Sequence, residues 1–385
     1  MIETVWPYLA VVLLAAGLFP SLERRYGWRL FSVLPPIVLT YLLVTALAVA
    51  GLWQSTTEIA AAQRHLTSQL LPALLFLLMV GCDLRAILAL GPRMLAVFVC
   101  AMASILAAIV LAYLIYRNAL PADGWKMLAA LSATWTGGSA NLVAVKQSIG
   151  LPDNLLPPVL LADALCYSVW VVLLFSAVRF APAFNRWTRA NERALPVAAA
   201  PRANSEAGAG GVLLWLGIAL LVGNGAMALA ALLPTQGFLT VTAWTVLIAT
   251  VAGLALARTP LAASPVPAPL AGALLACLVA VLASQSNFAG MSAAPLFVLV
   301  GFTVLVLHVG LFALAARAFR FDLYLCGISS LAQIGGMATA PVLAATYSRA
   351  LVPAAVLLAM LGLVLGTGIG LFMAGVLSGL SPTGG

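Results

Sequence analysis

Charged residues are scarce in this chain. Its 385 residues include 18 Lys or Arg, 10 Asp or Glu and two His, and charged side chains make up 7%. A soluble domain has about 25% charged residues, whereas 64% of this chain is hydrophobic. The composition excludes a soluble globular protein. It predicts an all-α polytopic membrane protein, because helices satisfy their own backbone groups in lipid.

Enzyme motifs are also missing. The sequence contains no P-loop, no GxSxG motif, no HExxH motif and no carboxylates paired at catalytic spacing. Its five cysteines show no CxxC spacing, so neither a disulfide framework nor a metal site has support. We therefore expect that the protein is not an enzyme, uses no cofactor and holds no metal other than a transported Na⁺.

The positive charge of the chain is dispersed. The net charge is +8, but no Lys/Arg cluster lies on a soluble module, so nucleic acid is excluded as a partner. Arginines in loops are instead expected to determine the membrane topology and to contact anionic lipid headgroups. The expected partners are the lipid bilayer and a small-molecule or ion substrate. The oligomeric state stays open, a homodimer included.

Apolar segments long enough to span a bilayer are abundant. The stretch 179–210, rich in Ala, Pro, Arg, Asn and Gly, predicts a flexible linker that divides them into two sets of six. We expect panel helices in 1–60 and 211–260, and core helices in 61–178 and 261–385. The twelve segments are roughly 4–20, 30–52, 70–90, 94–116, 124–148, 154–178, 211–233, 239–257, 269–287, 295–316, 323–347 and 353–378.

Two short stretches at corresponding places match each other. Residues 132–141 read SATWTGGSAN, and residues 330–339, 198 positions later, read SLAQIGGMAT. Each places a Gly-Gly pair inside an apolar segment, and a glycine costs a helix about 1 kcal/mol. A helix break is therefore expected at both pairs. Duplicated breaks of this kind point to the binding site of a secondary transporter.

Polar residues surround both breaks. A broken helix exposes carbonyl oxygens on one half and N–H groups on the other, and each half-helix directs a partial charge at the break. Nearby hydroxyls and amides can complete a shell for a cation or hold a carboxylate. Close helix packing through small residues is the alternative. The candidate substrate or ion ligands are Thr134, Thr136, Gly137, Gly138, Ser139, Asn141, Gln333, Gly335, Gly336 and Thr339.

Two ionisable residues lie deep in apolar segments. Asp163 is the one carboxylate well inside such a segment, in the helix after the first break. An ionised carboxylate there needs a partner, so we expect Asp163 to bind the coupling Na⁺ or proton; a helix cap is the alternative. His308, in the helix before the second break, either shares that titration or is a neutral side chain bonded to a carbonyl. Lys146 is expected to extend to the membrane interface.

The positions of the loop arginines do not by themselves settle the orientation of the two repeats. Five apolar segments separate the interrupted ones, so full crossings would make the repeats parallel. Strict alternation cannot place all the loop arginines on the cytoplasmic side. A re-entrant segment or a further crossing between 154 and 320 reconciles the two. We therefore favour inverted repeats, each with one discontinuous helix that crosses the other at mid-membrane.

At these residues the chain resembles a known family. Residues 136–141, TGGSAN, the following pair Ala162-Asp163, and Gly335-Gly336 resemble the DUF819 family of membrane proteins of unknown function. That family is similar to the cation/proton antiporter and bile-acid-symporter superfamily. The resemblance implies a core domain with two crossed, broken helices and a panel domain against which it moves.

The chain departs from the antiporters of that superfamily at two positions. Sodium/proton antiporters of that fold carry Asn-Asp or Asp-Asp where this chain has Ala162-Asp163. Electrogenic members carry a lysine on the helix where this chain has His308. Both departures weigh against the standard antiport mechanism and are compatible with a proton- or sodium-coupled carrier.

The combined expectation is a secondary active transporter of the inner (plasma) membrane of a bacterium. It would carry a small solute, an organic anion by preference, by alternating access and with sodium or proton coupling. A monovalent cation/proton antiporter is the first alternative, favoured by Asp163 and His308. A non-transporting membrane scaffold or receptor is the second, and the duplicated breaks argue against it.

Overall fold

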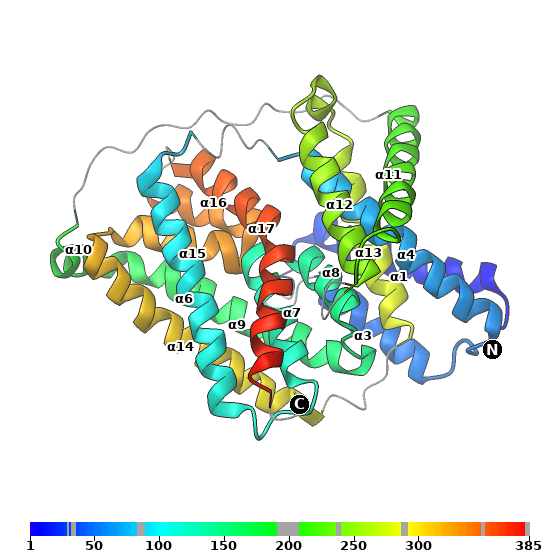
Figure 1. Cartoon of the computed structure of the whole chain (residues 1–385), viewed down its shortest axis with the longest axis horizontal. Helices are drawn as coiled ribbons and strands as arrows, with labels where there is room; N and C mark the ends of the chain where they lie inside the picture. Colours follow the sequence, from blue (N-terminus) through cyan, green and yellow to red (C-terminus); the bar gives the residue numbers. More distant parts are fainter. Residues whose placement is uncertain are drawn as a thin grey trace. The chain divides into compact units, whose positions relative to one another are not determined.

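The computed structural model describes residues 1–28, 31, 36–82, 89–190, 208–235, 240–285, 292–347 and 351–381. Within these ranges the regular structure is helical, and an isolated bridge between Ile2 and Trp53 is the one β-type pairing (Figure 1). The chain divides into two compact units. Unit 1 comprises 1–81, 146–165 and 204–295, and unit 2 comprises 82–145, 166–203 and 296–385.

Among the described residues, six helices are long and apolar enough to cross a membrane. They are Val5–Tyr26, Pro92–Tyr116, Asp153–Thr188, Ala209–Ala230, Ala294–Phe319 and Val352–Gly379. Four shorter apolar helices accompany them, at Pro36–Val49, Val241–Leu256, Pro267–Ala283 and Leu323–Ile334. In length and composition these helices are those of an integral membrane protein, as the composition predicts.

Unit 1 is organised around one helix. Helix α4 packs against α11, α12 and α13, and α1 and α3 pack against α13. The approach of α12 to α4 is close at Gly253, where an added Cβ would lie 2.5 Å from the Phe76 carbonyl oxygen. The bounds are α1 (Val5–Tyr26), α3 (Pro36–Val49), α4 (Thr57–Val80), α11 (Ala209–Ala230), α12 (Val241–Leu256) and α13 (Pro267–Ala283).

Helix α4 begins much earlier than the apolar pattern predicts. The sequence indicated a segment from about residue 70, but the helix begins at Thr57. The side chain of Thr56 accepts a hydrogen bond from the backbone N–H of Ile59, an N-cap that satisfies one of the free donors of the first turn. A capped polar turn extends the helix although its residues are hydrophilic, which hydropathy alone does not register.

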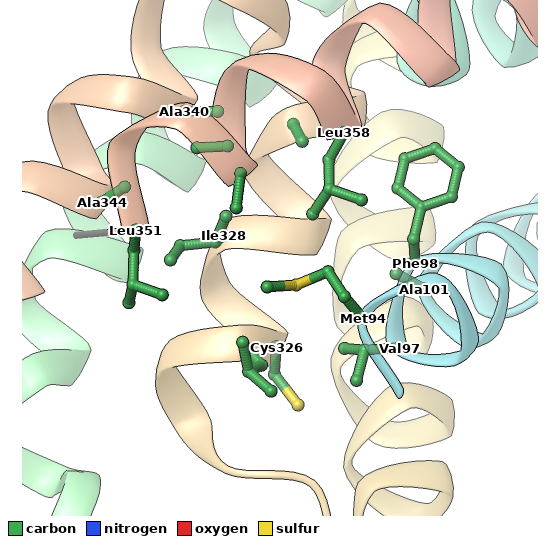
Figure 2. Packing of buried hydrophobic residues seen from close by; sticks show 14 of the residues in the cluster. Met94, Val97, Phe98, Ala101, Cys326, Ile328, Ala340, Ala344, Leu351 and Leu358 are labelled. Atoms are coloured by element: carbon green, nitrogen blue, oxygen red, sulfur yellow. The ribbon is translucent and has the colours of Figure 1, made fainter. Parts of the chain in front are cut away.

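Unit 2 is built from α6, α7, α10, α14, α15, α16 and α17, with parts of α8 and α9. Its apolar core joins α6, α14, α15, α16 and α17. Figure 2 shows Phe98 of α6, Ile328 of α15 and Leu358 of α17 in this core. The bounds are α6 (Pro92–Tyr116), α7 (Gly124–Gly137), α8 (Ser139–Ile149), α9 (Leu156–Ala177), α10 (Ala181–Thr188), α14 (Ala294–Phe319), α15 (Leu323–Ile334), α16 (Gly336–Tyr347) and α17 (Val352–Gly379).

The grouping of helices by contact differs from the panel and core ranges expected from the sequence. Helices α4 and α13 belong to the unit that contains 1–60 and 211–260, whereas the sequence placed most of both in core ranges. The expected flexible linker, 179–210, is helical in its first part, because a 3-10 turn up to Phe180 leads into α10 (Ala181–Thr188), and residues 191–207 lie outside the described residues. The assignment of panel and core, and the inverted repeats, stay predictions.

Candidate functional site

The structure breaks both helices at the predicted glycine pairs. Helix α7 ends at Gly137 and α8 begins at Ser139. Helix α15 ends at Ile334 and α16 begins at Gly336. The predicted breaks are confirmed, and each interrupted apolar segment is a pair of half-helices.

The second glycine of each pair is required by its backbone conformation. Gly138 has φ of 90° and Gly336 has φ of 64°. Residues with a Cβ rarely adopt this left-handed region, whereas glycine enters it at no steric cost. An added Cβ at either position would meet nothing within 4 Å. The constraint on these two glycines is therefore conformational and local.

The first glycine of each pair has close neighbours, and at Gly137 space itself requires a glycine. A Cβ on Gly137 would lie 2.7 Å from the carbonyl oxygen of Gly362 and 2.9 Å from the Cα of Gly366. A Cβ on Gly335 would lie 2.8 Å from Cδ1 of Leu331. Real Cβ atoms do not approach other atoms this closely. Gly137 and Gly138 thus have different roles. At Gly335 the two closest atoms are the side-chain ends of Thr339 and Leu331, which can shift, so the limit on space there is weaker.

Helix α17 supports the first break with a stripe of glycines. Gly362, Gly366 and Gly370 recur every four residues, so they lie on one face of the helix. Added Cβ atoms there would collide with Thr136, with Gly137 or with Ala133, all on α7. The stripe lets the two backbones touch, the arrangement that small residues permit between membrane helices. The packing interpretation of the Gly-Gly motif therefore holds at this contact.

Asn141 joins the two sides of the first break to α17. Its Nδ2 donates to the carbonyl oxygen of Gly137 at 2.7 Å and to that of Leu363 at 3.2 Å. The Thr367 hydroxyl donates to its Oδ1 at 2.5 Å. Asn141 is 1% exposed, and these bonds occupy both of its N–H donors. The side chain predicted to bind a ligand holds the break in place.

The second break repeats part of this arrangement. The hydroxyl of Thr339 donates to the carbonyl oxygen of Gly335 at 3.1 Å. Thr339 and Gly335 correspond to Asn141 and Gly137 in the 198-residue repeat. In both halves, a side chain four residues on satisfies the last free carbonyl before the break.

Gln333 lies in the last turn of α15, two residues before Gly335, and has unused hydrogen-bonding capacity. Its Nε2 donates to the carbonyl oxygen of Phe98, on α6, at 3.0 Å. Its Oε1 and the hydroxyl of Ser329 have no hydrogen-bond partner among the described residues, although both side chains are fully buried. The two residues are four apart and share a face of α15. This face of α15 therefore carries two buried oxygen atoms with unused hydrogen-bonding capacity among the described residues.

The other predicted ligands near the first break differ in accessibility. Thr134 and Thr136 are buried, and the Thr136 hydroxyl donates to the carbonyl oxygen of Ser132 at 2.8 Å. Gly137, Gly138 and Ser139 are half-buried. The backbone at the break is thus more accessible than the hydroxyls that precede it.

His308 is the centre of a buried hydrogen-bonded chain. Ser104 donates to the carbonyl oxygen of Ala101 at 2.7 Å and lies 2.8 Å from the Nδ1 of His308. The indole Nε1 of Trp170 donates to Ser330 at 3.1 Å, and Ser330 lies 2.9 Å from the Nε2 of His308. This hydrogen-bonded chain of side chains connects α6, α14, α15 and α9.

The hydrogen-bond donors in this chain fix the tautomer of His308. Trp170 can only donate, so Ser330 accepts from it and has its own proton free for Nε2 of the imidazole. Ser104 uses its proton on Ala101, so it accepts a proton from Nδ1. A neutral imidazole protonated on Nδ1 satisfies every group. The hydrogen-bond partners of His308 are thus two serine hydroxyls and not the expected backbone carbonyl, and its part in coupling stays a prediction.

An apolar cavity adjoins this chain within unit 2. It has a volume of about 470 Å³, and its lining includes His308, Ser330 and Trp170. Phe312, also in the lining, stacks on the imidazole with ring centroids 5.4 Å apart. The polar chain therefore forms one wall of an otherwise apolar space.

Replacing Ser330 in this hydrogen-bonded chain should destabilise the protein. Ser330→Ala leaves the indole N–H of Trp170 and the Nε2 of His308 without partners, and each buried unsatisfied group costs about 1–3 kcal/mol. Ser132 occupies the matched position in the first repeat, but its hydroxyl donates only to the carbonyl oxygen of Ala129 within its own helix. Ser132→Ala should therefore cost less than about 1 kcal/mol. Unfolding midpoints in detergent would compare the two, and equal midpoints would contradict the hydrogen-bonded chain.

Asp163 lies on α9 within the part of that helix assigned to unit 1. It is half-buried and has an interaction partner in the structure. The other predicted site residues, on α7, α8, α14, α15 and α16, belong to unit 2. Its expected role in coupling stays a prediction.

Several residues around the breaks were missed by sequence reasoning. The spacing of Gly362, Gly366 and Gly370 is a recognisable small-residue signal in an apolar segment, and it could have identified α17 as the partner helix. Thr367 and Trp170 carry no comparable local signal, because their partners are distant in sequence.

The helices and the broken-helix site define an integral α-helical membrane protein. The model of the DUF819 family, described as a protein of unknown function, matches residues 9–380, and the chain belongs to that family. The predicted resemblance is confirmed at this level. No curated protein matches the chain.

Proposed function

We propose that this protein is a secondary active transporter that carries a small organic anion, coupled to sodium or protons. It would act by alternating access in the inner membrane of a bacterium, with panel and core helices moving against each other. Kinship with the cation/proton antiporter and bile-acid-symporter superfamily is part of the same proposal.

The observation that carries the proposal is the convergence of the two broken helices. Helix α7 packs against α15. The carbonyl oxygen of Thr136, at the end of α7, meets the position of a Cβ on Gly362, and that of Ala332, near the end of α15, lies 3.8 Å from the same point. The negative ends of two half-helices thus reach one residue of α17. Carbonyl oxygens and half-helix C-termini are the groups that coordinate Na⁺ in transporters with broken helices.

Further groups at the breaks support both a cation and an anion. The side-chain oxygens of Gln333 and Ser329, which have no partner in the described part of the chain, add hard ligands of the kind a monovalent cation takes. The N-termini of α8 and α16, at Ser139 and Gly336, carry the opposite partial charge and suit a carboxylate. One duplicated motif can therefore serve coupling ion and substrate together.

Cation/proton antiport is less well supported by the residues. Asp163 follows an alanine, so the second member of an acidic or amide pair is lacking. His308 has two serine hydroxyls as hydrogen-bond partners, and a neutral imidazole satisfies both. Proteoliposomes with imposed sodium or pH gradients would separate the two functions. Organic-acid uptake driven by a gradient is expected, and cation-driven proton flux without any organic acid would favour antiport.

Asp163→Asn is the coupling test. The change keeps the size of the side chain and removes the charge that a proton or Na⁺ would neutralise. Uptake driven by an ion gradient should fall to the background of empty liposomes. Exchange of labelled substrate at equilibrium, which needs no gradient, should persist at a reduced rate. Full gradient-driven uptake by this variant would rule out Asp163 as the coupling residue.

A further inference from the structure

Unit 1 contains a cavity of its own with charged walls. Its volume is about 390 Å³, and all of its lining residues belong to unit 1. The charged members of the lining are Arg64, Lys146 and Asp153. The formal charge of the wall is therefore +1, which favours an anion over a cation.

Lys146 is the unusual member of this wall. Sequence reasoning placed it at the membrane interface, but it is buried, with 4% of its side chain exposed. Its Nζ lies 2.5 Å from Oδ1 of Asp153, whose side chain is 35% exposed. A buried ammonium group is costly without a partner, so this ion pair explains how a lysine can occupy the site. The pair also places a cation with three N–H donors at the cavity wall.

Arg64 supplies the second cation. It lies on α4, is exposed, and takes part in no ion pair among the described residues. Its guanidinium is charged at any physiological pH and matches the geometry of a carboxylate. Of the two cations in the cavity wall, Lys146 thus has a counterion within the protein, whereas Arg64 has none among the described residues.

The rest of the lining is amphipathic. Gln147 and Thr242 add polar groups, whereas Leu71, Met227 and Val246 are apolar. A cavity of this volume is within the range of small-molecule sites, in which few polar groups orient a ligand against apolar walls. The ligand that matches both parts has one negative group and a short apolar body.

We propose that this cavity binds a small organic monocarboxylate, with its carboxylate at Lys146 and Arg64 and its apolar part against Leu71 and Met227. Asp153 competes with the ligand for Lys146, so the internal ion pair limits affinity. This binding proposal does not depend on the proposed function. The cavity is a second site, in unit 1, for the class of substrate that the proposed function places at the breaks in unit 2, and its link to transport rests on that proposed function.

Binding can be measured on the purified full-length chain in nanodiscs. The probes are butanoate, hexanoate and benzoate, each with its uncharged amide as a matched control. Saturable binding of at least one carboxylate, and of none of the amides, is expected by isothermal titration calorimetry. If no carboxylate binds, or if acid and amide bind equally, the proposal is overturned. Equal binding of chloride and hexanoate would overturn the assignment of an organic ligand.

Substitutions of the two lining cations test whether the carboxylate binds in this cavity. Lys146→Met and Arg64→Gln each remove one cation and should weaken carboxylate binding at least about tenfold, since hydrogen bonds between charged groups are the strong ones. Arg258→Gln is the matched control, because Arg258 is an exposed arginine of unit 1 outside the lining. It should bind as the wild type does. Equal losses in all three variants would place the site elsewhere.

Asp153→Asn should change the affinity for the carboxylate in the opposite direction. Removing the carboxylate frees Lys146 for the ligand, so affinity should rise several-fold. A purely structural ion pair would instead lower stability in Asp153→Asn without any gain in affinity. This variant also keeps the test valid if Lys146→Met does not fold. Unchanged or weaker binding by folded Asp153→Asn overturns the competition.

The binding proposal and the transport proposal can be refuted separately. Specific carboxylate binding without gradient-driven uptake would refute the proposed function and leave the cavity assignment intact. Unchanged carboxylate binding in Arg64→Gln, with uptake of the same carboxylate intact, would refute the cavity assignment and leave the transporter proposal intact.

Discussion

Gly362→Ala and Gly366→Ala should each destabilise the protein by roughly 3 kcal/mol, the upper range for overpacking a tight contact. A Cβ on Gly366 would lie 2.8 Å from the Cα of Gly137, and one on Gly362 would overlap the Thr136 carbonyl oxygen. Both obstacles are backbone atoms of α7, which cannot rotate away as a side chain can. The loss should appear although alanine is the better helix former by about 1 kcal/mol.

Gly368→Ala is the matched control on the same helix. An added Cβ at Gly368 meets nothing within 4 Å, so this variant should be neutral or slightly more stable. Unfolding in mixed micelles and the fraction of monodisperse protein would measure the three variants. If all three unfold at the same denaturant concentration, the close packing of α17 on the break is incorrect.

Asn141→Ala should be the most damaging change among the polar residues at the breaks. It leaves the carbonyl oxygens of Gly137 and Leu363 and the hydroxyl of Thr367 without their partner. At about 1–3 kcal/mol for each buried unsatisfied group, the expected loss is about 4 kcal/mol. Asn141→Asp should lose much of the same stability, because a carboxylate cannot donate to the two carbonyls.

A double-mutant cycle separates this structural role from ligand binding. Thr367→Val removes only the hydroxyl that bonds Asn141, so the two changes should be coupled by about 0.5–3 kcal/mol. The coupling should be present in protein without substrate or sodium. Additive losses in the absence of ligand would contradict the bond between Asn141 and Thr367. A coupling found only with ligand would restore Asn141 as a ligand-binding residue.

The helix breaks could be predicted because their causes are local. Gly138 and Gly336 are in conformations that only glycine adopts readily, and glycine pairs lower helix propensity wherever they occur. The duplication, at an interval of 198 residues, then singled out these two places among many glycines. The start of α4 at Thr57 was missed, because a capped polar turn has no hydropathy signal.

The roles of the polar side chains could not be predicted, because their partners are distant. Asn141 bonds a residue 222 positions away, and the two serines that bracket His308 come from different helices. A sequence pattern shows that a polar group is buried, and burial requires a partner. Which partner is present depends on which helices become neighbours.

The sequence by itself determined the membrane class, the approximate helices and the places where two of them break, because composition, apolar length and glycine conformation act within a short stretch of chain. Only the tertiary structure decided that α17 supports the first break, that His308 lies between two serines in a buried hydrogen-bonded network, and that Lys146 is a buried partner of Asp153 in a cavity wall. Those outcomes arise from packing and from the pairing of buried polar groups, and both depend on contacts between segments far apart in the sequence.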